Sequence, residues 1–342
     1  MTASANKRAV RAIMRRCDSK RRLNILTFAT HERYEENLCK TGHQFYSLSL
    51  GKTWDTDYAP VPSNYNIIDT IPDYIDFDLI LTHTSCDRML NAHKYLTGLD
   101  INEGNRTAIP ILRHTHVLPD VRFDVSSQIT AFQQYPSDKD SFISTYNMEA
   151  WGKTKDESAN VIEHGIDIDF WKLDDSIKRD NACLSVVNDW PNRDWCCGFN
   201  LWKHTVQGLP IKVFGKSPGL SEPADSTQHL REIYQSSRIF YNTSLHSPVP
   251  TVLLEAMACG CAIVSTANCM IPEIIENGKN GLISNDPQEL RGFLELLIKD
   301  KDLAEELGNN ARKTIVEKYS LERFTNNWNN LLYSTVNEYR NI

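Results

Sequence analysis

The sequence has no long hydrophobic run and little of the composition that marks an unusual architecture. No apolar stretch approaches the roughly 18 residues that a membrane-spanning helix needs, and the N-terminus lacks the apolar core of a secretory signal. Glycine (15) and proline (14) are too scarce among 342 residues for a collagen-like or low-complexity chain. With 41% hydrophobic and 24% charged residues, the composition indicates a folded globular protein, which we expect in the cytoplasm.

The cysteines lack the pattern of a disulfide framework or a zinc site. Their number, nine, is odd, and Cys259 and Cys261 stand only two positions apart across a glycine, so no Cys/His pair completes a four-ligand set. We therefore expect reduced thiols and no bound metal.

Charge is distributed unevenly along the chain, whose net charge is −7. Residues 1–22 carry eight basic side chains and Asp18, a net charge of +7, which leaves −14 for the remainder. Such a basic arm can lie against an anionic membrane or DNA through residues 7–22, or it can be a solvated terminus.

Short apolar runs alternate with amphipathic stretches, the pattern of parallel sheets covered by helices. At about 150 residues per domain, the length predicts two domains. Helices are predicted at Glu32–Lys40 and Asp87–Thr97. The predicted strands are Leu23–Phe28, Phe45–Leu48, Leu79–Thr82, Ile109–Leu112, Phe142–Ser144, Val161–Glu163, Cys183–Asn188, Ile211–Gly215, Arg238–Asn242, Ala262–Ser265 and Gly281–Ser284.

The domain organisation follows from this pattern and from one polar segment. Gly165–Asn181 is rich in Asp and Lys without a sustained apolar period, and we interpret it as the crossing between domains. We predict an α/β protein of two Rossmann-like domains with a cleft between them, where ligands of open parallel sheets bind. The predicted parts are a basic arm (1–22), an N-terminal Rossmann-like domain (23–168), a C-terminal Rossmann-like domain (169–320) and a last helix (321–342) that packs back towards the N-terminal domain.

The most informative stretch is 240–281, FYNTSLHSPVPTVLLEAMACGCAIVSTANCMIPEIIENGKNG. A strand ends at a polar loop, Pro250 suits a first helical turn, and Thr251–Ala258 continues as a helix that stops at Gly260. The free amides and partial positive charge of the helix start are suited to a diphosphate.

This stretch resembles the retaining family-4 (group 1) glycosyltransferases of the glycosyltransferase-B fold. Their signature is two glutamates eight positions apart, an Ala-Met-Ala-x-Gly helix end, an apolar strand, a Pro-Glu and an Asn-Gly turn. Further landmarks over about residues 23–335 are Gly42-His43, Ile109-Pro110 before His116, Phe142-Ile143-Ser144 and the run 164–167. The residues that match the signature are Glu255, Ala256, Met257, Ala258, Gly260, Pro272, Glu273, Asn280 and Gly281.

The resemblance implies roles for four residues. Glu255 would hold the ribose hydroxyls of the donor, although a glutamate early in a helix can also simply complement the dipole. His116 would face the transferred sugar, with His114, two residues away on the same strand face, as the alternative in register. Ser247 stands where the family has its first glutamate, as a weaker and neutral partner, so the donor sugar differs from the family pattern or activity is reduced.

The phosphate-binding groups also depart from the family pattern. Prolines leave only Val249 and Thr251 as backbone donors before the helix, and Arg193 would supply the guanidinium. Cys197 occupies the position of the family lysine. Lys203 or Lys216 can supply the missing charge, although both also fit solvated surface lysines.

Two polar or aromatic segments complete the expected site. Thr30–Tyr34 follows the first strand, which makes His31 and Arg33 candidates for acceptor contact, together with His114. Among Trp190, Trp195 and Trp202, one can stack on a nucleobase or sugar, and core packing is the alternative.

The sequence therefore predicts a glycosyltransferase that moves a sugar from a nucleotide-sugar donor to an acceptor hydroxyl, with retention of configuration and without a metal or other cofactor. The acceptor is a glycan, a glycolipid or a hydroxylated nucleic acid such as modified viral DNA, and the basic arm places the protein peripherally at a membrane or on DNA. Two alternatives are a degenerate, non-catalytic module that binds a nucleotide-sugar, glycan or DNA, and a nucleotide-sugar epimerase.

Overall fold

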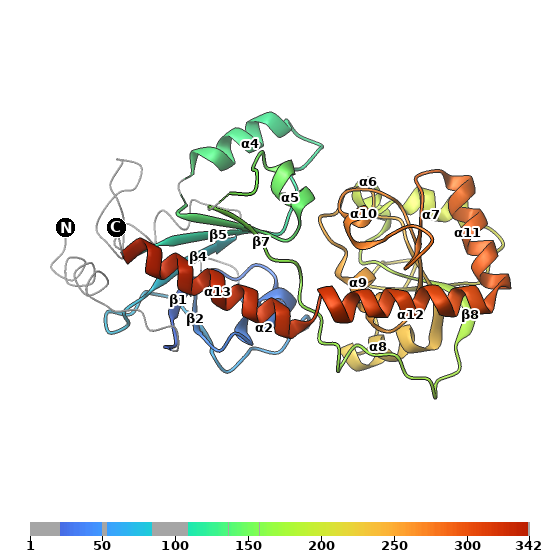
Figure 1. The fold of residues 1–342 in the computed structure, drawn as a ribbon, viewed down its shortest axis with the longest axis horizontal. Helices are drawn as coiled ribbons and strands as arrows, with labels where there is room; N and C mark the ends of the chain where they lie inside the picture. The colour runs from blue at the N-terminus through green and yellow to red at the C-terminus, as the bar shows by residue number, and fades with distance from the viewer. Residues whose placement is uncertain (1–20, 50–52, 84–108, 136, 157, 341–342) are drawn as a thin grey trace. The chain divides into compact units, whose positions relative to one another are not determined.

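The computed structural model describes residues 21–49, 53–83, 109–135, 137–156 and 158–340 (Figure 1). Most of the basic arm and the predicted helix Asp87–Thr97 lie outside these ranges. Contacts divide the chain into two units, one ending at Glu163 and resuming at Glu322, the other formed by His164–Leu321. The sequence predicts these boundaries at 168/169 and 320/321.

The first unit is built on a parallel sheet in the order β3-β2-β1-β4-β5-β6-β7. Strand β3, which the sequence pattern missed, is an edge strand of only four residues, of which Tyr65 alone is buried. The predicted Phe142–Ser144 strand lies three residues earlier, because Ser144 caps the next helix. The strands are β1 (Asn24–Thr27), β2 (Gln44–Leu48), β3 (Tyr65–Ile68), β4 (Leu79–His83), β5 (Ile111–Thr115), β6 (Lys139–Phe142) and β7 (Ala159–Val161).

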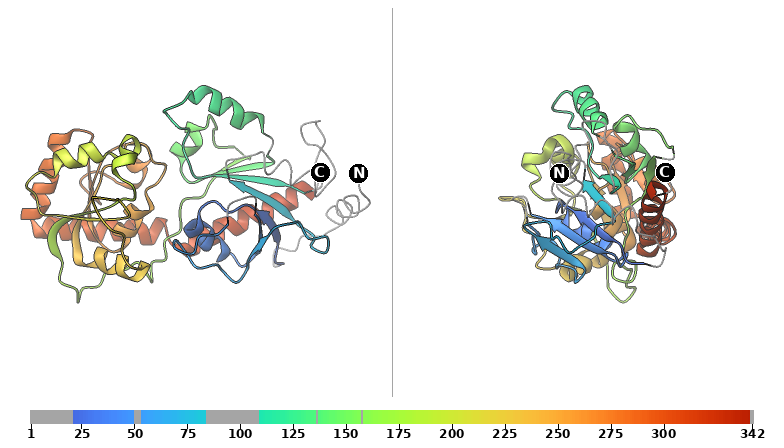
Figure 2. Two further views of the ribbon diagram at one scale, coloured as in Figure 1. Left: turned by 180° about the vertical axis from the view of Figure 1, so that it is seen from behind. Right: turned by 90° about the vertical axis from the view of Figure 1, so that its left-hand side faces the viewer.

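Side-chain caps start the helices that cover this sheet. His31, Asp124 and Ser144 each accept a hydrogen bond from a backbone N–H two or three residues into the helix. Helix α13 comes from the far end of the chain and lies along the first unit in both views (Figures 1 and 2). The indole of its buried Trp328 donates to the hydroxyl of Tyr34 at 3.1 Å. The helices are α2 (Glu32–Cys39), α4 (Val125–Gln134), α5 (Thr145–Ala150) and α13 (Leu321–Arg340).

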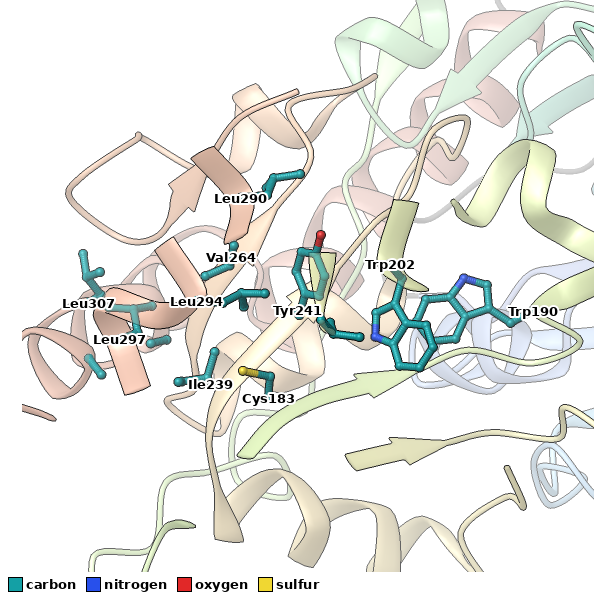
Figure 3. Close-up of a cluster of buried hydrophobic side chains, with 13 residues drawn as sticks. Cys183, Trp190, Trp202, Ile239, Tyr241, Val264, Leu290, Leu294, Leu297 and Leu307 are labelled. Carbon is teal, nitrogen blue, oxygen red and sulfur yellow. The ribbon is translucent and has the colours of Figure 1, made fainter. Parts of the chain in front are cut away.

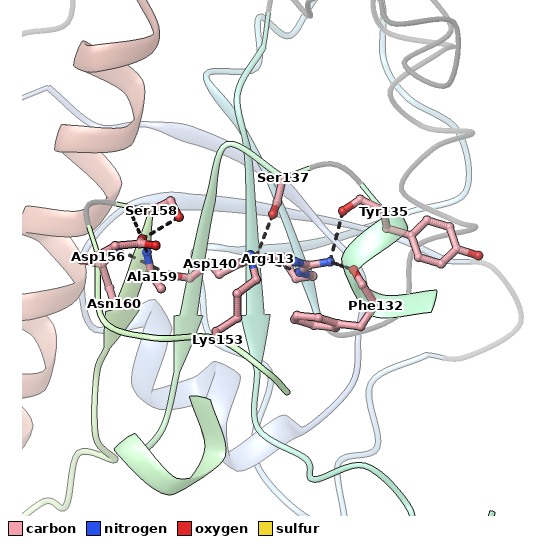
Figure 4. Close-up of polar contacts among 10 residues, drawn as sticks. All are labelled: Arg113, Phe132, Tyr135, Ser137, Asp140, Lys153, Asp156, Ser158, Ala159 and Asn160. Atoms are coloured by element: carbon pink, nitrogen blue, oxygen red, sulfur yellow. Dashed lines mark hydrogen bonds and ion pairs between the residues drawn. The ribbon is translucent and has the colours of Figure 1, made fainter. Parts of the chain in front are cut away.

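A buried ion pair joins β5, β6 and the end of α4 (Figure 4). The guanidinium of Arg113 donates to both carboxylate oxygens of Asp140, at 2.8 and 2.9 Å, and to the carbonyl of Phe132 at 2.6 Å. Lys153 lies 3.0 Å from the same carboxylate. Because every donor finds a partner with bidentate geometry, the charge is tolerated inside the sheet layer and fixes where α4 ends.

Arg21 also belongs to the first unit, at the end of the basic arm. Its guanidinium donates to the buried carboxylate of Asp78 at 2.7 Å, and its carbonyl accepts from the hydroxyl of Tyr333 on α13 at 3.0 Å. The arm available for other contacts is therefore shorter than the predicted 1–22, because Arg21 is committed to the fold.

The second unit has a parallel sheet in the order β12-β11-β10-β8-β9. Its strands are β8 (Asp180–Val186), β9 (Ile211–Phe214), β10 (Ser237–Asn242), β11 (Ala262–Ser265) and β12 (Leu282–Ile283). Its helices are the 3-10 turn η2 (Pro191–Arg193), α6 (Asp194–Cys197), α7 (Phe199–Thr205), α8 (Thr227–Ser236), α9 (Thr251–Ala258), α10 (Ile271–Ile274), α11 (Pro287–Lys299) and α12 (Lys301–Lys318).

The core of the second unit contains two of the three tryptophans that flank its first loop (Figure 3). Trp190 and Trp202 are buried, with ring centroids 4.8 Å apart, and they pack with Tyr241 and leucines of α11. Core packing is therefore the role of this pair, and Trp195 alone of the three remains partly exposed.

The polar segment Gly165–Asn181 belongs to the second unit and does not cross between units. Ile166 and Trp171 are buried anchors, and the N–H of Ile166 donates to the carbonyl of Tyr319 at 2.7 Å. Two anchors spaced five residues apart leave no apolar period, so the packing of this segment was not predictable from its composition. None of the helices in the described ranges is both long and apolar enough to span a bilayer.

We predict that His43 makes the stability of the first unit depend on pH. Its Nδ1 accepts from the N–H of Leu23 at 3.2 Å, and burial lowers its pKa to about 4. The neutral form is therefore favoured on folding, and stability present above pH 6.5 is lost as the pH falls towards 4, by about 3 kcal/mol for a shift of this size. Urea unfolding of wild type and His43→Asn, which keeps an acceptor for Leu23, measures this loss. Equal losses in both proteins would contradict the assignment.

Candidate functional site

In each sheet, the chain places its next strands on one side of the first strand and later strands on the other side. The position where this change occurs is the topological switch point. In the second unit β9 lies on one side of β8, while β10, β11 and β12 follow on the other. In the first unit β2 and β3 lie on one side of β1, while β4 to β7 follow on the other. Ligands of open parallel sheets bind at the carboxyl ends of the strands at such switch points. The candidate sites are therefore the ends of β8 and β10 in one unit and of β1 and β4 in the other.

The loops after β8 and β10 are joined by hydrogen bonds. The carbonyl of Cys196 accepts from the N–H groups of Leu245 at 2.8 Å and His246 at 3.1 Å. The carbonyl of Cys197 accepts from the hydroxyl of Thr243 at 2.9 Å. The first loop therefore holds the second, which leads through Ser247 into α9.

Gly198 permits this close approach. Its φ is +65°, and a Cβ placed there would lie 2.2 Å from the carbonyl oxygen of Thr243. Both the left-handed backbone and the lack of space require glycine.

Helix α9 begins at this edge with free amides and ends among cations. Pro250 is its N-cap and provides no side-chain acceptor, so no side chain caps the amides of the first turn. At the other end, Arg179 donates to the carbonyls of Cys259 and Gly260, and Arg312 donates to that of Ala258. The negative end of the helix is thus neutralised, while the positive end remains for an anion.

Glu255 lies in α9, and Ser247 and Val249 precede this helix. Glu255 is 5% exposed, and one of its carboxylate oxygens accepts from the hydroxyl of Tyr234 on α8 at 3.3 Å. Ser247 is partly exposed, and Val249 is buried just before Pro250. Tyr234, which orients the carboxylate, is a contact that the motif did not reveal.

The structure separates the two candidate lysines. Arg193 and Lys216 are both exposed, and their loops meet at Asn188, whose carbonyl accepts from Arg193 at 3.4 Å and whose side-chain oxygen accepts from the N–H of Lys216 at 2.8 Å. Lys203 is exposed in the last turn of α7, which leads back to the amino ends of the strands. The structure therefore brings Lys216, and not Lys203, towards Arg193.

Cys197, at the position where the resemblance leads us to expect a lysine, is a neutral thiol. Its thiol lies 3.6 Å from that of Cys196, and this contact together with burial raises its pKa well above the ordinary range. Within the described residues, no group of three His, Cys, Asp or Glu side chains is arranged to hold a metal ion.

Four histidines gather at the corresponding edge of the first unit. The ring centroid of His116, just after β5, lies 5.9 Å from that of His31, 5.5 Å from that of His83 and 5.7 Å from that of His114. His114 is completely buried, with Nδ1 2.8 Å from the hydroxyl of Ser141. His116 is partly exposed, so it is the accessible member of the predicted pair.

The two other predicted acceptor-side residues lie at the start of α2. His31 is its exposed N-cap, and Arg33 is half-buried in its first turn. Sequence reasoning missed Glu35, on the same turn of α2, and its two partners Tyr65 and His83. No sequence signal could have found His83 or Tyr65, because strand order alone brings them near Glu35.

Comparisons with known proteins give a family for part of the chain. Residues 223–314 match the model of the glycosyl transferases group 1. A probable sucrose-phosphate synthase of Thermosipho melanesiensis is 35% identical over 126 residues, which are 36% of this chain and 29% of that protein. The N-acetyl-alpha-D-glucosaminyl L-malate synthase of Bacillus anthracis is 30% identical over 163 residues, which are 47% of this chain and 40% of that protein. The chain thus spans less than half the length of these relatives.

Solved structures resemble most of the chain in fold. Anabaena Alr3699/HepE in complex with UDP has a TM-score of 0.70 at 14% identity, covering 92% of this chain and all of the other. Sucrose-phosphate synthase from Thermosynechococcus elongatus has a TM-score of 0.67 at 14% identity, covering 91% of this chain and 98% of the other.

We predict that Gly198→Ala disrupts the loops at the second unit's switch point. Gly208 provides a matched control, because its φ is also positive (+75°) while nothing lies within 4 Å of a Cβ placed there. Both variants introduce the same backbone strain, but only Gly198→Ala also displaces Thr243. We therefore expect the free energy of unfolding of Gly198→Ala, measured by chemical denaturation, to be about 1 kcal/mol lower than that of Gly208→Ala. Similar losses in both variants would show that the close approach is not needed.

Proposed function

We propose, from the premise that this chain belongs to the group 1 glycosyltransferases and has their glycosyltransferase-B fold, that it transfers a sugar from a nucleotide-sugar donor to an acceptor hydroxyl. The match over residues 223–314 supports group 1 membership, and the fold shared with HepE confirms the predicted fold class. We further propose that transfer proceeds with retention of configuration and without a metal.

The observation that carries this proposal is the cluster of positively charged groups and helix amides at the carboxyl ends of the second unit's strands. The start of α9, Arg193 and Lys216 place backbone amides and two cations at the ends of neighbouring strands. These groups suit the diphosphate of a donor, and their positive charge can stabilise a leaving nucleotide diphosphate in the way a metal does elsewhere. We assign Lys203 to the solvated surface, which is the alternative that the sequence analysis gives for it.

The remaining roles follow the motif. We assign Glu255 to the donor ribose, because a carboxylate accepts two hydrogen bonds from a vicinal diol and Tyr234 holds it in place. We assign Ser247 and His116 to the transferred sugar. Ser247 and the neutral Cys197 weaken the donor site relative to the family pattern, and this specific observation favours the degenerate binding module as the second candidate.

The function is tested by calorimetric titration and thermal shift with UDP, GDP, ADP and TDP and their common sugars. At 100 times its dissociation constant a nucleotide adds about 2.7 kcal/mol and raises Tm by about 5 °C or more. We expect one nucleotide to be selected and Glu255→Ala to weaken its binding about tenfold or more, as for a lost charge-assisted contact. Unchanged affinity in Glu255→Ala would remove the ribose assignment.

Release of free nucleotide separates the two candidates. A transferase cleaves its nucleotide-sugar and releases free nucleotide when a suitable acceptor is present. A binding module binds the nucleotide-sugar but leaves the bond between nucleotide and sugar intact. Binding of no nucleotide by well-folded protein would contradict both candidates.

We propose that the acceptor is a glycan or glycolipid, or a hydroxylated nucleic acid, and that the arm before Arg21 recruits it. Residues 1–20 carry six basic side chains and Asp18, a net charge of +5. Deletion of residues 1–20, which spares the Arg21–Asp78 pair, should weaken salt-dependent binding to phosphatidylserine vesicles or to duplex DNA. Flotation and gel-shift assays measure the two, with phosphatidylcholine vesicles as the uncharged control. Binding that deletion leaves unchanged would contradict a role for the arm.

A further inference from the structure

One buried carboxylate joins the loop after β1 and the end of β4, at the switch point of the first unit, to the first residue of the edge strand β3. Glu35, on the first turn of α2, accepts on Oε1 from the N–H of Thr30 at 2.7 Å, from its hydroxyl at 3.0 Å and from the N–H of His31 at 3.3 Å. Its Oε2 accepts from the hydroxyl of Tyr65 on β3. His83, at the end of β4, has Nε2 4.0 Å from Oε1.

These contacts lie where the strand order predicts a ligand. Thr30 and His31 follow β1, and His83 ends β4, the two neighbours between which the chain reverses its direction of strand addition. Glu35 and His83 are nearly inaccessible, with 3% and 1% of their side chains exposed. The imidazole of His31 is exposed, while the backbone that carries it is held by the buried carboxylate of Glu35.

The cap of α2 determines which nitrogen of His31 carries the proton. Nδ1 accepts the N–H of Tyr34 at 3.3 Å, so this nitrogen provides a lone pair and holds no hydrogen. In a neutral imidazole with a bare Nδ1, the hydrogen is on Nε2.

We propose that His31 is a specificity-determining residue of the acceptor site, whose Nε2–H donates a hydrogen bond to an oxygen of a neutral sugar, and that Glu35 is the positioning residue that holds it there. This inference rests on the proposed function. His31 is then a donor and not a general base, because the lone pair that a base needs is occupied by the helix cap. The recognised group is a hydroxyl or ring oxygen, and the ring of His116, 5.9 Å away, borders the same position.

Two substitutions separate the cap from the donor. In His31→Asn the side-chain oxygen stands near the place of Nδ1 and retains an efficient N-cap, while the Nε2–H is lost. In His31→Gln the amide reaches the place of Nε2, while the cap is lost. We expect His31→Asn to keep the wild-type Tm and lose sugar contact, and His31→Gln to lower Tm by about 2–4 °C and retain part of the contact.

Nitrogen NMR of the full chain labelled at histidine provides the direct test. The signal of His31 is identified by its absence in His31→Asn, and we expect Nδ1 to have the shift of a bare nitrogen and Nε2 that of a protonated one. Titration with the methyl α-glycosides of glucose, galactose and mannose should move the Nε2 signal of His31. His204, exposed on α7 of the second unit, is the internal control and should not move.

The results that overturn the proposal are distinct from those that overturn the function. Protonated Nδ1, or a His31 signal that no methyl glycoside moves more than that of His204, would refute the role of His31 whatever the nucleotide result. Failure to bind any nucleotide in calorimetry on the same sample would instead refute the proposed function.

Glu35 is tested by rescue. Glu35→Gln keeps an oxygen for the N–H groups of Thr30 and His31, whereas Glu35→Ala removes it. We expect Glu35→Ala to abolish the response of His31 to methyl glycosides and Glu35→Gln to restore most of it, with nucleotide affinity unchanged in both. Loss of nucleotide affinity to the same extent would indicate a merely structural role and would overturn the assignment.

Discussion

The polarity of the parallel sheet is the constraint on which both candidate sites depend. When all strands run the same way, their loops of one kind lie along one edge, and the reversal of strand addition leaves two of those loops side by side. Every residue assigned a role projects from such a loop or from the helix that follows it. The cores below, from the Trp190–Trp202 pair to the Arg113–Asp140 pair, keep these edges rigid.

Electrostatics at the second unit's edge are set by backbone as much as by side chains. The motif led us to expect an arginine and a lysine after β8, and Cys197 at the expected lysine position is a neutral thiol. Lys216 approaches from the neighbouring strand, and the arginines at the far end of α9 leave the positive end of its dipole uncompensated. The cations and backbone amides at this edge therefore come from several strands.

The sequence predicted the alternating α/β pattern, most strands to within three residues and the α9 motif, because these signals are local. It could not distinguish Lys203 from Lys216, or Trp195 from its buried neighbours, since the choice depends on which strand lies beside β8. Glu35 illustrates the same limit. From the sequence alone, Glu35 is an acidic residue near the start of a helix. Its hydrogen bond with Tyr65 and its approach to His83 follow from the strand order, which the sequence does not give.

The return of α13 has a consequence for how the protein is made. The second unit is inserted, in chain order, between the first 163 residues and the helix that completes the first unit. The Tyr34–Trp328 hydrogen bond spans 294 positions, so it forms only after nearly all of the chain has left the ribosome. During synthesis the second unit can therefore finish folding before the first, and the first-made part of the protein is the last to be closed.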